Sequence, residues 1–129
     1  MALLLAAGVP WARAVEESPV GFTAPNMYAA RFVGLVRRDL ADRIPGKETL
    51  FKQYVDELDF QFETMSIFGH VFGYNIDLDG RFPYDLTLLD RDCDGIFETK
   101  VDHRVDRDVE MTIPECVFAL DPRLRSSAR

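Results

Sequence analysis

The stretch from residue 90 to residue 98 holds the side chains whose types and spacing are best suited to chemistry. Three aspartates occupy alternate positions, a glycine follows the third of them, and a glutamate ends the stretch. A hard cation such as Ca²⁺ is coordinated by oxygen atoms, and a glycine at the sixth position allows a sharp turn that brings the next carbonyl to the ion. The predicted calcium ligands are Asp90, Asp92, Asp94, the backbone carbonyl of Ile96, and Glu98.

This loop resembles those of the DxDxDG calcium-loop proteins, a broad group that includes EF-hands and the propeller loops of integrin α subunits. The resemblance covers only the loop itself. An EF-hand has a bidentate glutamate at position twelve, where this chain has Val101. The flanks, 84–89 and 96–101, have the composition of strands rather than helices. The resemblance is therefore closer to the integrin type, in which the acid at position nine is a ligand. The alternative is a solvated turn that binds no ion.

A second stretch repeats part of this pattern fifteen residues earlier. Asn75, Asp77, Asp79 and Gly80 match the three aspartates and the glycine of the first loop. Pro83 occupies the position that matches Glu98 of the first loop, so Asp85 would have to supply that ligand. The alternative is a strand whose polar face carries these residues, ending in a turn. A strand over 82–89 would place the two loops at its opposite ends, too far apart for one binuclear site.

The charge of the chain restricts its partners. The chain has 129 residues, the length of one domain, and a formal net charge of −7. Between residues 75 and 110 there are eleven acidic and five basic residues. Nucleic-acid binding depends on lysine and arginine contacts to phosphate, so nucleic acid is not an expected partner. A calcium ion or a basic protein surface suits this acidic region.

The first fourteen residues resemble a secretory signal. Their apolar run is too short to span a bilayer, and Ala12-Arg13-Ala14 fits a cleavage site, so the mature chain would start at Val15. We expect a secreted or periplasmic protein with no membrane span. Two cysteines, Cys93 and Cys116, invite a disulfide in such an oxidising compartment; the alternative is two buried thiols.

The hydrophobic pattern predicts an α+β domain over residues 15–120, followed by a frayed tail over 121–129. Asn26 is a suitable N-cap, and apolar residues recur every four positions over 27–44, which predicts an N-terminal helix ending before Pro45. This helix would pack on one face of a single antiparallel sheet of about five strands. The expected strands span 58–63, 66–76, 82–89, 96–101 and 111–118. If 30–36 were a strand instead, the domain would be an all-β sandwich or barrel.

No catalytic motif is evident in the sequence. There is no G-x-S-x-G, no glycine-rich phosphate loop, and no zinc-type spacing, since His70 and His103 are isolated. Glu63 and Glu98 could form a glycosidase pair only if the fold brought them together. We therefore expect a small secreted calcium-binding domain that is not itself catalytic. The alternative is an acidic protein-interaction or inhibitor-like module with no bound metal, and calcium titration separates the two.

Overall fold

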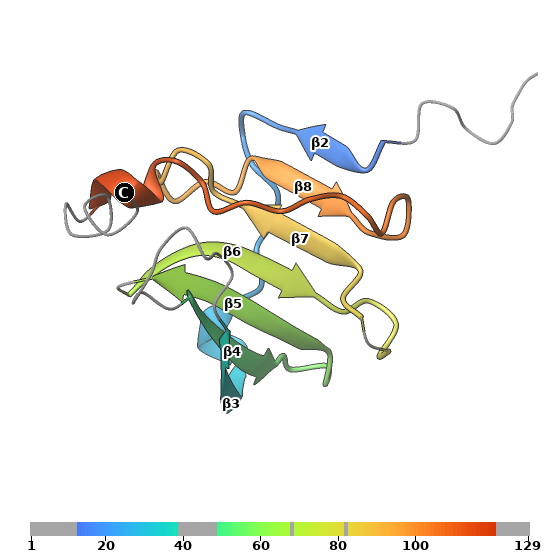
Figure 1. Cartoon of the computed structure of the whole chain (residues 1–129). Coiled ribbons are helices and arrows are strands. Elements are labelled where there is room, and N and C mark those ends of the chain that lie inside the picture. Colours follow the sequence, from blue (N-terminus) through green and yellow to red (C-terminus); the bar gives the residue numbers. More distant parts are fainter. Residues whose placement is uncertain (1–12, 39–48, 68, 82, 121–129) are drawn as a thin grey trace, which may run out of the picture.

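The computed structural model describes residues 13–38, 49–67, 69–81 and 83–120. In this part of the chain, seven strands form one antiparallel sheet in the order β2-β8-β7-β6-β5-β4-β3 (Figure 1). The strands are β2 Val15–Glu17, β3 Arg31–Arg38, β4 Thr49–Val55, β5 Gln61–Ile67, β6 His70–Ile76, β7 Leu86–Leu89 and β8 Thr99–Asp102. The helical elements are a 3₁₀ turn, η1 Met27–Ala29, and a short helix, α1 Val117–Leu120.

The predicted α+β fold, with an N-terminal helix over 27–44 and about five strands, is wrong. Asn26 does cap a helical turn, because its side chain accepts a hydrogen bond from the Tyr28 N–H, but this turn ends at Ala29 and β3 follows. The pairing of β3 with β4 skips Val33, which is a β-bulge. A bulge interrupts the alternation by which a strand is recognised, and the apolar residues on both sides of it then fit a helical period equally well. Residues 39–44 of the predicted helix lie outside the described residues.

The sandwich or barrel that a strand at 30–36 would imply is not observed either, because the described strands form one open sheet whose ends are β2 and β3. The expected strand over 66–76 is divided by a turn at Gly69, whose φ of +79° favours glycine, and becomes part of β5 and all of β6. The expected strand over 111–118 is wrong. The chain turns at Pro114, whose carbonyl accepts the Val117 N–H, and α1 begins there.

Each face of the sheet carries its own small core. On one face, Phe51, Met65 and Leu89 are buried against Ile113 and Val117 of the C-terminal segment. Figure 1 shows this segment (orange to red) crossing the sheet before it reaches α1. On the other face, a cluster of Phe62, Tyr74 and Leu88 packs against N-terminal residues that include Phe22, Ala24 and Met27. The sheet is thus covered by irregular segments from both ends of the chain.

The described residues contain no helix long and apolar enough to cross a membrane. The predicted signal peptide, residues 1–14, lies outside the described residues except for its last two positions. The predicted tail, residues 121–129, lies outside them entirely.

Candidate metal centres

The loop between β7 and β8 gathers three of the predicted calcium ligands. Asp90 directly follows β7 and Glu98 directly precedes β8, so both positions are fixed by strand ends. Carboxylate oxygens of Asp90, Asp94 and Glu98 all lie within 4.8 Å of one another. The Asp90 side chain is fully buried, whereas Asp94 is exposed. These three acids, called the 90–98 cluster below, could hold a metal ion.

Backbone N–H groups shape this loop around its carboxylates. Asp90 accepts one hydrogen bond from the Asp94 N–H (3.2 Å) and one from the Gly95 N–H (2.8 Å). Glu98 Oε1 accepts from the Arg91 N–H at 2.9 Å, and Asp94 Oδ1 accepts from the Ile96 N–H at 2.9 Å. Gly95 has a φ of +89°, a conformation in which a side chain is strained. The glycine of the motif is therefore required by the turn.

One oxygen of the 90–98 cluster has no partner. Glu98 Oε2 is buried and accepts no hydrogen bond. Leaving a buried acceptor unsatisfied costs about 1–3 kcal/mol, and more when the group is charged, so native proteins rarely tolerate it without a reason. Because this oxygen belongs to a group of converging carboxylates, a cation is the partner that best fits it.

The other two predicted ligands in this loop are Asp92 and the carbonyl of Ile96. Asp92 is exposed and does not belong to the 90–98 cluster. The Ile96 carbonyl stays a predicted ligand, and the Ile96 N–H donates the hydrogen bond to Asp94 that is described above. The carboxylates that the structure brings together occupy loop positions one, five and nine, and not the alternating positions one, three and five.

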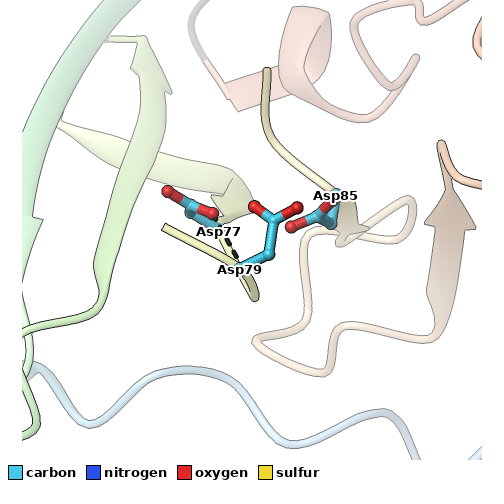
Figure 2. A group of neighbouring side chains, drawn as sticks. All are labelled: Asp77, Asp79 and Asp85. Atoms are coloured by element: carbon cyan, nitrogen blue, oxygen red, sulfur yellow. Dashed lines mark hydrogen bonds between the residues drawn. The ribbon is translucent and has the colours of Figure 1, made fainter. Parts of the chain in front are cut away.

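The loop between β6 and β7 holds a second acidic group. Carboxylate oxygens of Asp77, Asp79 and Asp85 lie within 4.8 Å of one another. Figure 2 shows these three side chains close together, with the Asp79 N–H donating to Asp77 across 3.1 Å. Asp77 and Asp85 are buried and Asp79 is exposed. We call this group the 77–85 cluster; Asn75, which the sequence also suggested, contacts Glu63 and Thr87 instead.

The two loops are built by the same set of contacts. Asp77, like Asp90, accepts from the N–H groups of the inner aspartate and of the glycine that follows it. Asp85, like Glu98, accepts from the residue directly after the first acid, with Leu78 N–H donating at 2.7 Å. Asp79, like Asp94, caps the N–H two residues ahead, that of Arg81. In each loop the first and last acids are eight residues apart. The sequence suggested Asp85 only as a substitute for the acid that Pro83 replaces, whereas this spacing from Asp77 is the more direct signal.

The two clusters are separate. They lie at opposite ends of β7, whose four residues span about 13 Å, and they share no residue. Within the described residues the ion pairs join Lys100 to Glu16 and Arg104 to Asp102, so no clustered carboxylate takes part in one. The Arg81 N–H holds the pKa of Asp79 below its ordinary value, which keeps that carboxyl ionised.

A disulfide between Cys93 and Cys116 connects the 90–98 loop to the C-terminal segment. The two Cα atoms are 5.9 Å apart, and Cys93 has a φ of +58°. The N-terminal segment contacts the same loop, because the Ser18 N–H donates to the Glu98 carbonyl and the Phe22 N–H to the Phe97 carbonyl. Three parts of the chain that are distant in sequence therefore meet at this loop.

Sequence reasoning missed a second group of polar residues, on the sheet itself. Glu63, the last residue of the expected strand over 58–63, is 1% exposed. It contacts Asn75 and Tyr84, and it is not part of the 90–98 cluster that contains Glu98. Comparisons with protein-family models, with curated proteins and with solved structures found no match to this chain.

Proposed function

We propose that the 90–98 loop binds one Ca²⁺ ion and that the protein is a small calcium-binding domain in which the ion has a structural role. The observation that carries this proposal is the buried Glu98 Oε2, which has no hydrogen-bond partner and lies among carboxylates. A bound cation would satisfy this oxygen and remove the mutual repulsion of Asp90, Asp94 and Glu98.

The donor atoms favour calcium over other metals. The cluster offers only carboxylate oxygens, which suit hard cations, and no nitrogen or sulfur that would favour zinc or copper. Ca²⁺ accepts six to eight oxygens in flexible geometry, so waters and loop carbonyls can complete its shell, whereas Mg²⁺ needs a tighter octahedron. The exposed position of Asp94 leaves one side of the site open to such waters.

The structural role follows from what the loop connects. The 90–98 loop joins β7 to β8, and the contacts described above attach it to both terminal segments. Fixing its carboxylates around an ion would stabilise the sheet and both of its covers together. Binding that is specific to the folded state adds RT ln(1 + [L]/Kd) to stability, about 2.7 kcal/mol at a hundredfold excess over Kd.

We propose the 77–85 loop as a weaker calcium site. Its carboxylates are arranged in the same way, but its surroundings are more basic. Each loop contains one arginine, Arg81 or Arg91, but the charge of Arg104 is also close enough to act on Asp85 and Asp79. Positive charge near the carboxylates opposes a second cation.

Calorimetric titration of the metal-free protein with Ca²⁺ tests the proposal through two matched variants. Asp94→Asn and Asp92→Asn change the net charge equally, two residues apart on the same exposed loop. We expect Asp94→Asn to abolish the tighter binding event and Asp92→Asn to leave most of it, because only Asp94 belongs to the cluster. Glu98→Gln should act like Asp94→Asn.

The wild-type protein should also melt several degrees higher in Ca²⁺ than in EDTA, with a smaller effect of Mg²⁺. Identical melting in EDTA and in about 10 mM Ca²⁺, well above the dissociation constants of weak extracellular sites, would reject calcium binding. Loss of binding in Asp92→Asn with retention in Asp94→Asn would show instead that the ligands follow the alternating positions of the sequence motif.

We also propose that the protein is exported to a secreted or periplasmic location. The Cys93–Cys116 disulfide supports this, since such bonds persist in oxidising compartments and are rare in reducing ones. In addition, extracellular modules often bind calcium weakly, with dissociation constants of about 10⁻⁴–10⁻³ M. An exposed loop is able to bind calcium with an affinity in that range. The intact mass of protein from its native host should correspond to a chain starting at Val15. A cytosolic species that retains Met1 would contradict export.

A further inference from the structure

A row of polar side chains runs across the face of the sheet that the C-terminal segment covers. Gln53 pairs with Glu63, Glu63 with Asn75, and Asn75 with Thr87, so these four residues of β4 to β7 point to the same face. Glu63 and Thr87 are 1% and 0% exposed. A polar row of this kind normally faces water, and its burial needs an explanation.

The hydrogen bonds of this row all donate in the direction of Glu63. Thr87 Oγ1 lies 2.6 Å from Asn75 Oδ1, to which it donates its only hydrogen. Thr87 must therefore accept the contact from His103 Nε2 at 2.7 Å, so that nitrogen carries the hydrogen. Asn75 Nδ2 then donates to Glu63 Oε1 at 2.9 Å, and the Tyr84 hydroxyl donates to Glu63 Oε2 at 3.2 Å. Such convergence of donors suits an ionised carboxylate.

Glu63 lacks a positive partner in the part of the chain that the structure describes. Its two hydrogen bonds come from a neutral amide and a neutral hydroxyl, and it joins no ion pair among the described residues. Burying a carboxylate without a counter-charge costs several kcal/mol, so buried charges are usually paired. Each carboxylate oxygen accepts one of these hydrogen bonds and has a second lone pair for another donor.

Glu63 lines a pocket of about 340 Å³, which is within the range of small-molecule sites, about 300–1,000 Å³. Asn75, Tyr84 and Thr87 contribute polar atoms to the same wall. Phe51, Met65 and Met111 form apolar surface in the pocket. Aromatic and thioether groups are polarisable and pack well against the body of a small organic cation.

Among the described residues that line this pocket, Arg107 carries the positive charge. Its Nη1 donates to the backbone carbonyl of Tyr84, whereas the hydroxyl at the other end of the same residue contacts Glu63. Burial first, and then the charge of Arg107, hold the pKa of His103 below its ordinary value, so His103 is neutral at pH 7. Among the described residues, the pocket thus has one buried negative group, Glu63. The guanidinium of Arg107 is hydrogen-bonded to the Tyr84 carbonyl and not to Glu63.

We propose that this pocket binds a small organic amine, with the ammonium group directed at the buried Glu63 in the pocket wall and the apolar body against Met111. An ammonium supplies both the counter-charge and the additional hydrogen-bond donors that Glu63 lacks. This site is distinct from the two acidic clusters and shares no carboxylate with them.

Titrations followed by NMR test this with three probes of similar shape: benzylamine, benzyl alcohol and benzoate, with n-butylamine as a smaller amine. For fragments of this size we expect Kd on the order of 1 mM for the amines, roughly tenfold weaker binding of the alcohol, and no binding of benzoate. The NMR signals whose chemical shifts change on amine binding should include those of the Met65 and Met111 methyl groups. Amine binding should be equal in EDTA and in Ca²⁺, which separates this site from the proposed metal sites.

Glu63→Gln keeps the size of the side chain and removes its charge, so it should weaken benzylamine binding roughly tenfold while leaving the alcohol unchanged. Glu110→Gln, an exposed glutamate beside Met111, is the control and should bind as the wild type does. Equal affinity of wild-type protein for amine and alcohol, or no binding of either amine at about 10 mM, would overturn the proposal. That comparison needs no variant and holds even if Glu63→Gln folds poorly.

Discussion

Removing the Cys93–Cys116 disulfide should destabilise the domain substantially. The bond connects residues 23 positions apart, and constraining an unfolded chain over a loop of this length is worth about 3 kcal/mol. The total stability of a domain is only about 5–15 kcal/mol, so the loss is a large fraction of it. The bond also attaches the 90–98 loop to the segment that covers the core of Phe51, Met65 and Leu89.

Urea denaturation of a Cys93→Ser/Cys116→Ser variant, in EDTA and in Ca²⁺, measures this effect. We expect the midpoint to fall by about 1–3 M urea, given slopes of about 1–3 kcal/mol per M. Calcium affinity should fall as well, because the loop loses its attachment. Wild-type protein reduced with a thiol is the control without any substitution. A loss below about 1 kcal/mol, with calcium affinity unchanged, would refute the idea that this bond holds the loop in place.

Two further predictions concern Gly73 in β6 and His103 after β8. Gly73→Ala should destabilise the protein by about 1–3 kcal/mol, because an added Cβ would contact the Met65 methyl and lie 3.1 Å from the Leu88 carbonyl. Thermal melts measure this effect. The matched control is Gly34→Ala, because a Cβ at Gly34 meets nothing within 4 Å. The pKa of His103 is lowered, so the folded state disfavours protonation of this side chain. The contribution of neutral His103 to stability is therefore complete above the ordinary pKa of about 6.5. That contribution is lost as the pH falls through the lowered pKa of the folded state. His103→Gln should therefore reduce the difference in urea midpoint between pH 7 and pH 5, and an unchanged difference would contradict this.

The acidic loops could be found in the sequence because their chemistry is local. Asp90, Asp94 and Glu98 lie within nine residues, and the spacing alone indicates that they can converge. The choice among the acids could not be made in this way. Asp92 and Asp94 are equivalent in the motif, and backbone geometry, including the positive φ of Cys93 and Gly95, decides which carboxylate faces the others.

The fold and the polar row depend on contacts between distant parts of the chain. The bulge at Val33 obscured a strand that β4 stabilises by pairing. Glu63 alternates with apolar residues as a solvent-facing residue would, and it is buried because residues more than forty positions later cover that face of the sheet. Alternation identifies the two faces of a strand but not which of them, or whether both, will be covered.

The most direct test of the calcium proposal is a crystal structure of the protein soaked in about 10 mM Ca²⁺, well above the dissociation constants of weak extracellular modules. We predict one strong anomalous peak among Asp90, Asp94 and Glu98, with carboxylate oxygens at about 2.3–2.6 Å and the otherwise unpartnered Glu98 Oε2 among the ligands. A map with no ion in the 90–98 loop, or with an ion that Glu98 does not contact, would contradict the account.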